Sequence, residues 1–362
     1  MGPKGLYQHA RLSVPRLAEG YCTDDNARAV QLLVELAAHQ HLVSLSEKVN
    51  DFLEPCWFFV QQAQTSSGAF RNFRASDGRW LDDRGSEDTQ ARVARCLAAV
   101  LSHDRHEERR QQAAAMLDRL VPHLRRFRFC RSLAEAMIAL EGLPPANRTP
   151  QTAAALQFAW QQLKSKWERH ASGQWPWFEP KLTYANAILT HGWLSGTRAL
   201  SVQPDRAAMD IISRSTEWLI KTTIQGGTFV PVGNKAWYFR DAQGFVRSRY
   251  DQQPIEAHTM FDWLLAYNQQ AAQPLSPAII VAPYLWWYGS NSQRVLVFNQ
   301  RRGAGYDGLT AHGRNENQGA ESLLAHLRSE LLFRQAPLKV RQYGERQLRQ
   351  LVPRREAVAF PT

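Results

Sequence analysis

Apolar residues recur at three- and four-residue spacing in eleven segments of this chain, and no alternating run is long enough for a central sheet. That period marks one buried face of an α-helix, so the sequence predicts an all-α fold. The predicted helices span 24–40, 45–63, 87–101, 109–120, 132–140, 152–167, 182–200, 206–221, 255–267, 277–288 and 319–333. The basic, weakly amphipathic stretch 338–353 is interpreted as either a terminal helix or a tail.

Connections within helix pairs are short, whereas those before every second helix are long and rich in glycine and aromatic residues. Each long connection leads to acidic residues, which gives a degenerate repeat of about 50 to 70 residues, the length of one helical hairpin and a loop. The repeat predicts helical hairpins arranged in a ring, with the N-termini of alternate helices at a common mouth. The four long connections are 68–73, 173–178, 226–231 and 305–308.

Two helix openings match closely, since 24–28 and 88–92 each carry Asp and Arg four residues apart. Acids at a helix N-terminus also have an ordinary explanation, because they complement its unpaired N–H groups and partial positive charge. Glu256 follows Pro254 in the manner of a capping box, and the Asp–Arg spacing suits simple i,i+4 pairs. Capping, however, does not require a preceding loop loaded with aromatic rings.

Aromatic rings beside carboxylates and amides suit a sugar, whose C–H faces stack on rings while its hydroxyls need polar partners. Cleavage of a glycosidic bond requires a general acid and a second carboxylate that acts as base or nucleophile. Glu179 is a candidate acid, because Pro180 can start a helix and Trp177 and Phe178 can desolvate the carboxyl group. The other candidate catalytic residues are Asp88, Glu256 and Asp25.

Further polar and aromatic residues of the same loops and helix openings are predicted to bind substrate. Core packing is the competing explanation for the tryptophans among them. The set comprises Asp24, Arg28, Glu87, Arg92, Trp175, Trp177, Tyr184, Asn186, Trp237, Asp251, Gln252, Gln253, Glu316, Asn317 and Glu321.

Five strings resemble an uncharacterised group of bacterial carbohydrate-active domains: 20–28, 86–92, 175–180, 251–256 and 315–322. Members of that group resemble (α/α)6-toroid glycosidases and often accompany glycosyltransferases or mannoside phosphorylases. The resemblance therefore implies an (α/α)6 toroid, or six-hairpin barrel, over 1–335, followed by a basic helix or tail over 336–362. It also implies an oligosaccharide substrate and a possible glycosyltransferase partner. Residues 289–298 depart from the pattern, because the Asn-Asp pair expected before the last motif is missing.

Composition narrows the function classes. The net charge of +11 comes from cations scattered over polar helix faces, which favours a solvated basic surface over nucleic-acid binding. No stretch approaches the ~20 apolar residues of a membrane helix. The four cysteines form no CxxC pair, so reduced thiols in a cytoplasm are expected. We find no metal-ligand spacing, no dinucleotide fingerprint and no serine nucleophile elbow, and expect neither metal nor cofactor.

The leading hypothesis is a glycoside hydrolase, or a phosphorylase, that uses paired carboxylates. A phosphorylase needs an anion site, for which Arg28, Arg92, Arg314 or the 226–227 turn is available. The first alternative is a sugar epimerase or isomerase that uses histidines, with His9, His191, His258 and His312 available. His258 lies two residues after Glu256 and so faces about 200° away on a helix, which counts against a shared site. The second alternative is a non-catalytic carbohydrate-binding domain.

Overall fold

The computed structural model describes residues 1–2, 4–39, 46–200, 206–240, 247–271 and 273–351. Its regular structure is almost wholly helical, which confirms the all-α prediction. All eleven predicted helices are present in the described residues, where the basic stretch near the C-terminus supplies a twelfth α-helix, α12. Residues 40 and 45 of the predicted helices, and the predicted helix or tail beyond residue 351, lie outside the described residues. The helices are α1 Thr23–Ala38, α2 Ser46–Ala63, α3 Glu87–His103, α4 Glu107–Leu124, α5 Cys130–Glu141, α6 Pro150–His170, α7 Ala187–Leu200, α8 Arg206–Thr223, α9 Pro254–Asn268, α10 Pro277–Leu285, α11 Ala320–Gln335 and α12 Leu338–Leu351.

Short strands occur in the connections and pair only two by two in the described residues. The described residues contain five two-stranded sheets. The strands are antiparallel in four of them: β3 with β4, β5 with β8, β6 with β7 and β9 with β10. The strands are β1 Ala10–Arg11, β2 Val14–Pro15, β3 Tyr21–Cys22, β4 Phe73–Arg74, β5 Lys181–Leu182, β6 Ile224–Gln225, β7 Thr228–Phe229, β8 Tyr238–Phe239, β9 Leu309–Thr310 and β10 Gly313–Arg314.

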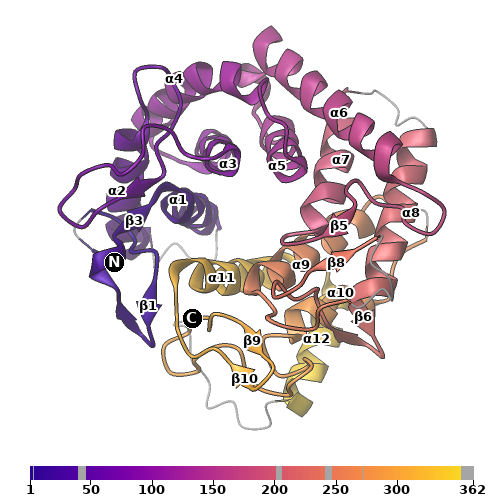
Figure 1. Ribbon diagram of the computed structural model, residues 1–362. Coiled ribbons are helices and arrows are strands. Elements are labelled where there is room, and N and C mark those ends of the chain that lie inside the picture. The colour runs from indigo at the N-terminus through magenta and orange to yellow at the C-terminus, as the bar shows by residue number, and fades with distance from the viewer. Residues whose placement is uncertain (3, 40–45, 201–205, 241–246, 272, 352–362) are drawn as a thin grey trace. The chain divides into compact units, whose positions relative to one another are not determined.

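The chain forms two compact units, each described here by itself. The first unit comprises Met1–Ala10, Val14–Phe178 and Leu189–Ile212, and the second comprises Arg11–Ser13, Glu179–Ile188 and the chain from Ser213 onward. In the first unit, α1, α3 and α5 lie side by side, and α2, α4 and α6 cover them as a second layer (Figure 1). In the second unit, α9 packs against α10 and α11, and α12 packs against α10.

Close helix packing in the first unit depends on one glycine. A Cβ atom built at Gly192 in α7 would lie 2.4 Å from the Cα atom of Ala134 in α5. A methyl group cannot fit there without moving the backbone, so Gly192 sets how closely these two helices approach.

Buried carboxamides explain why the residue pattern repeats at the helix openings. Asn26 in α1 accepts a hydrogen bond from the Leu6 N–H (2.8 Å) and donates to the Leu6 carbonyl (3.2 Å). Gln90 in α3 makes the same pair of bonds with Phe70, both at 2.8 Å. Asn186, just before α7, makes them with Thr183, at 2.9 and 2.8 Å. Each amide thus satisfies buried backbone groups of the loop that leads into its helix.

One predicted helix start is wrong. Pro180 does not open a helix, because its carbonyl accepts a bond from Arg240 N–H and the next two residues form β5, which pairs with β8. Helix α7 begins only at Ala187, after Ala185 adopts the left-handed φ of 46°. The helical period of 182–200 is real, but its first turn is used as a strand and a turn.

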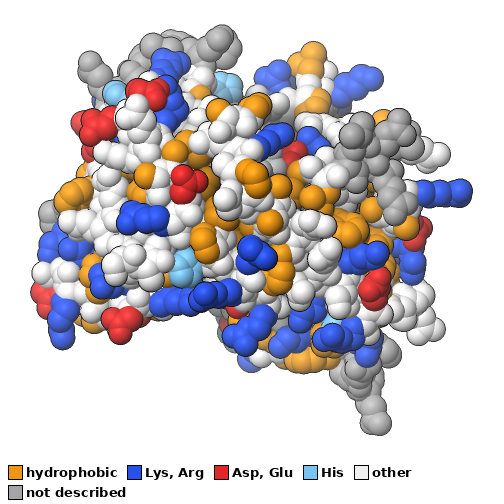
Figure 2. Space-filling view, turned by 90° about the horizontal axis from the view of Figure 1, so that it is seen from above, with side chains coloured by type: hydrophobic (Ala, Val, Ile, Leu, Met, Phe, Trp, Pro, Cys, Tyr) orange, Lys and Arg blue, Asp and Glu red, His pale blue; other side chains and the backbone are white. Residues whose placement is uncertain are grey.

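Lysine and arginine side chains are spread among acidic, apolar and neutral ones on the face that Figure 2 shows.

Candidate functional site

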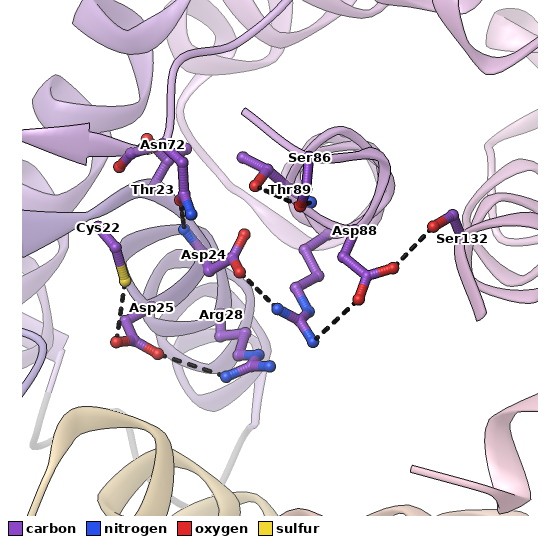
Figure 3. A network of polar contacts seen from close by, with 11 residues as sticks. Cys22, Thr23, Asp24, Asp25, Arg28, Asn72, Ser86, Asp88, Thr89 and Ser132 are labelled. Atoms are coloured by element: carbon purple, nitrogen blue, oxygen red, sulfur yellow. Dashed lines mark hydrogen bonds and ion pairs between the residues drawn. The ribbon is translucent and has the colours of Figure 1, made fainter. Parts of the chain in front are cut away.

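A network of carboxylates and arginines joins the N-terminal turns of α1, α3 and α5 (Figure 3). Arg92 of α3 donates to Asp24 of α1 and lies 3.9 Å from the Asp88 carboxylate in its own helix. Asp88 also accepts a bond of 2.7 Å from the Ser132 hydroxyl in α5. Arg28 pairs with Asp25 at 3.3 Å. The i,i+4 pair of Asp88 and Arg92 is present as predicted, but Arg92 also reaches Asp24 of α1, so the network links neighbouring helices.

The side chains of this network are only partly accessible to solvent. The side chains of Asp24, Asp88 and Arg92 are 14–20% exposed, and that of Asp25 is 8% exposed. Asn72, in the loop before β4, accepts a bond of 3.2 Å from the Asp24 N–H and so satisfies one of the first amides of α1. The result is a fixed array of acceptors and donors, the arrangement that sugar hydroxyls require.

Cys22 holds one carboxylate of this network. Its thiol donates to Asp25 Oδ2 at 3.0 Å, while Arg28 occupies Oδ1. Burial, reinforced by the charges of Asp25 and Asp24, raises the pKa of the Cys22 thiol well above its usual value. The thiol is therefore kept in its protonated, donor form. Burial likewise raises the pKa of Cys56 to about 12.

We expect Cys22 to be unreactive in the folded protein at pH 8, because thiolate is the reactive species and is scarce there. N-ethylmaleimide labelling followed by peptide mass mapping measures the rate of Cys22 modification. That rate should be at least about a hundredfold lower in buffer than in guanidinium chloride. Rapid labelling of Cys22 in buffer would contradict this placement. The labelling rate in denaturant is the control for intrinsic reactivity.

Glu87, a predicted substrate ligand, supports a loop. Its Oε2 atom accepts bonds from the backbone N–H groups of Arg128 (2.8 Å) and Phe129 (3.1 Å) just before α5. The helix itself is capped by Ser86, whose hydroxyl accepts from Thr89 N–H.

In the second unit, Glu256 lies in the first turn of α9 and is 4% exposed. The Asn186 amide lies 3.3 Å from Glu256 Oε2 and 3.5 Å from Oε1. The same amide is clamped to Thr183, and Ala185, directly before Asn186, has the left-handed backbone described above. Non-glycine residues in that conformation are over-represented at functional sites, where surrounding contacts impose it.

Gln252 and its neighbours hold the loop before α9. The Gln252 side chain is fully buried, donates to the Arg249 carbonyl and the Ser292 hydroxyl, and accepts from the Trp286 indole. Its described bonds thus join three segments of the unit. Gln253 is the half-buried N-cap residue of α9, and Asp251 is exposed.

The predicted aromatic residues fall into two groups. Trp175 and Trp177 are 3% and 0% exposed in the first unit, where the Trp177 ring packs edge-on against Phe178. They belong to the core, as the competing explanation held. Trp237 of the second unit is half-buried, with a left-handed φ of 56° fixed by backbone bonds to Gly233 and Ser248.

The remaining candidates lie in the second unit. Glu179 lies in the connection that leads into β5 and Tyr184 lies just after β5, and both side chains are half-buried. Glu316 is exposed and pairs with Arg314 at 3.1 Å, while Asn317 accepts a bond of 2.9 Å from Leu12 N–H. Glu321 stands half-buried in the first turn of α11.

The histidines considered for an epimerase differ in setting. His191 and His258 are half-buried in α7 and α9. His312 is exposed in the turn between β9 and β10, and the His9 side chain is 58% exposed and lies 3.9 Å from Glu19.

Sequence reasoning missed three members of the first-unit network: Cys22, Asn72 and Ser132. The three-residue spacing from Cys22 to Asp25 was visible, but Asn72 and Ser132 reach the network only through tertiary packing. Across the described residues, no group of three or more His, Cys, Asp and Glu side chains is arranged to hold a metal ion. None of the described helices is long and apolar enough to cross a bilayer.

No protein-family model matches the chain, and no curated protein matches it in sequence. Several solved structures match its fold. A sugar epimerase from a ruminal bacterium is 10% identical with a TM-score of 0.69, over 93% of this chain and 94% of that one. Cellobiose 2-epimerase from Spirochaeta thermophila is 13% identical with a TM-score of 0.65, over 96% and 91%. A GH76 α-mannanase from Bacteroides thetaiotaomicron is 8% identical with a TM-score of 0.56, over 91% and 88%. These similarities confirm the predicted (α/α)6-toroid fold, one that both sugar epimerases and glycoside hydrolases use.

Proposed function

We propose that this protein is a carbohydrate-active enzyme that hydrolyses a glycosidic bond in a neutral oligosaccharide. The observation that carries the proposal is the setting of Glu256, a carboxyl group almost wholly removed from water and held by an amide that is itself locked to the backbone. A general acid in glycoside hydrolysis is typically such a carboxyl group, because desolvation favours its protonated form. Glu256 would protonate the departing oxygen.

The polar network of the first unit, taken by itself, supplies further fixed carboxylates for sugar binding. Asp25 and Asp88 are each fixed by a hydrogen-bond donor and an arginine. A carboxylate held in this way accepts hydrogen bonds only, which suits activation of a water molecule or binding of sugar hydroxyls. Asp24 and Arg92 would bind hydroxyl groups beside it.

A phosphorylase has less support. The three arginines considered for phosphate each pair with an acid: Arg28 with Asp25, Arg92 with Asp24 and Asp88, and Arg314 with Glu316. Their positive charge is already balanced by carboxylates, whereas a phosphate site needs donors that are not paired with acids.

A sugar epimerase is the second candidate, favoured by the higher TM-scores to epimerases than to the mannanase. An epimerase would use histidine as acid or base, since epimerisation next to a carbonyl needs proton-transferring groups. A half-buried histidine is present in each unit, His191 in the first and His258 in the second. A cytoplasmic location and a glycosyltransferase partner remain predictions from the sequence.

One experiment separates the two enzymes. The full chain is incubated with cellobiose, β-1,4-mannobiose or maltose in ²H₂O, with and without phosphate, and followed by NMR and chromatography. Hydrolysis should release monosaccharides at a rate independent of phosphate. Epimerisation would keep the disaccharide length and exchange the C2 proton for deuterium. Binding without conversion of any sugar would overturn both proposals in favour of a carbohydrate-binding domain.

A further inference from the structure

Two phenyl rings in the first unit are exposed although each belongs to a tightly bonded loop. Phe73 is 44% exposed and Phe129 is 64% exposed. Phe73 lies in β4, paired with β3 just before α1, and Phe129 is the N-cap residue of α5. Both rings therefore stand at the helix openings that carry the polar network.

The register of β3 and β4 shows which way Phe73 faces. Phe73 lies opposite Cys22, and the Leu81 N–H donates to the Phe73 carbonyl from the other side at 2.9 Å. Directly opposite residues of antiparallel strands share a face, so Cys22 and Phe73 project together. The opposite face of the strand pair, with Tyr21 and Arg74, is packed: the Arg74 guanidinium lies 5.9 Å from the Phe59 ring.

The face shared by Cys22 and Phe73 changes from polar, at Cys22, to apolar, at Phe73 and Leu81. Cys22 is buried and its thiol bonds to Asp25, while Phe73 is part-exposed and Leu81 is 58% exposed. Phe73 is thus paired in register with Cys22, whose thiol bonds to the Asp25 carboxylate. A pyranose ring needs such a surface, because its hydroxyls bind polar groups while its C–H face stacks on a flat apolar group beside them.

A carboxylate fixes the backbone of each exposed ring. Asp82 accepts bonds from the N–H groups of Asn72 (2.8 Å) and Phe73 (2.7 Å). Glu87 accepts bonds from the N–H groups of Arg128 and Phe129 in the same way. Each acid holds the aromatic residue and the residue before it. Such clamps fix the backbone that carries each ring, which lowers the conformational entropy that binding has to remove.

The network lies directly beside Phe129 as well. Ser132, three residues after Phe129, bonds to Asp88, and Asp88 follows Glu87 in α3. The polar network runs from α1 through α3 to Ser132 of α5 (Figure 3). Phe73 belongs to the strand pair before α1 and Phe129 to the N-cap of α5, so the two residues belong to the two ends of this array.

We propose that Phe73 and Phe129 are the stacking residues of a sugar-binding site at the openings of α1, α3 and α5. They would bind the C–H faces of consecutive pyranose units of a neutral oligosaccharide, while Asp24, Asp25 and Arg92 take the hydroxyls. This inference rests on the proposed function and names the binding residues for its substrate. None of the aromatic residues chosen from the sequence belongs to this pair.

The test measures binding of cellotetraose and β-1,4-mannotetraose to the full chain by calorimetry. Phe73→Ala and Phe129→Ala should each weaken binding of the better ligand about three- to tenfold, because each removes one aromatic contact. Phe73→Trp and Phe129→Trp should retain it. Phe58→Ala is the matched control, because Phe58 is 56% exposed but lies in α2 of the second layer. It should leave affinity unchanged.

A second pair of variants tests the clamp. Asp82→Ala should weaken binding as Phe73→Ala does, whereas Asp83→Ala, a change at the exposed neighbouring residue, should not. Unchanged affinity in both phenylalanine-to-alanine variants, with wild-type sugar binding intact, would overturn the inference and leave the proposed function standing. Failure of the wild-type chain to bind or convert any of the sugars would instead remove the proposed function, and this inference with it.

Discussion

Glu256→Gln is expected to lower kcat about a thousandfold while changing KM by less than about threefold. A positioned general acid contributes roughly 10²–10⁴ to the rate, and glutamine keeps the size of the side chain and an oxygen for the Asn186 amide but cannot supply the proton. Initial rates on the disaccharide that the wild-type enzyme converts provide the measurement.

Two comparisons make the Glu256 result interpretable. Glu168→Gln removes an acid from α6, where the side chain is 62% exposed, and should keep wild-type kinetics. An unchanged melting temperature for Glu256→Gln would show that folding is intact. If the variant kept more than about a tenth of wild-type kcat, Glu256 would not be the general acid.

Arg92→Met is expected to lower the free energy of unfolding by about 3 kcal/mol. The Arg92 side chain is only 14% exposed and lies between the Asp24 and Asp88 carboxylates. Removing one partner of a largely buried pair leaves a charge that neither water nor protein stabilises well. Methionine keeps most of the volume, so the loss should come from the charge and not from a cavity.

Urea unfolding of the full chain checks the Arg92 prediction, with Arg110→Met as control. Arg110 in α4 pairs with Glu107 at the surface and should cost less than about 0.5 kcal/mol. Asp24→Asn combined with Arg92→Met should recover part of the loss, because the stranded carboxylate is then removed. Equal effects of Arg92→Met and Arg110→Met would show that the network is not a buried one.

The helices could be predicted because their signal is local. A buried stripe at three- and four-residue spacing is written into each segment, and the eleven predicted ranges correspond to α1 to α11. The start of α7 could not be predicted, because residues 181–182 pair with β8 more than fifty residues later. That competition between a helical turn and a strand is decided by a distant partner.

The candidate site was only partly visible in the sequence. The repeated Asp and Arg residues of α1 and α3 pointed to the network, but the partner of Arg92 is Asp24, 68 residues away, and not only the acid four residues before it. Trp175 and Trp177 looked like cleft residues because they precede an acid in a glycine-containing loop, yet both are buried. Composition cannot distinguish a ring that packs inward from one that projects outward.

The sequence by itself determined the all-α architecture, the hairpin repeat and the acids gathered at the helix openings, because periodicity and capping chemistry act over a few residues. Only the tertiary structure decided which acids meet arginines, which amides clamp loops and which aromatic rings face water. Those outcomes depend on contacts between residues far apart in the chain, whose geometry follows from packing of the whole unit.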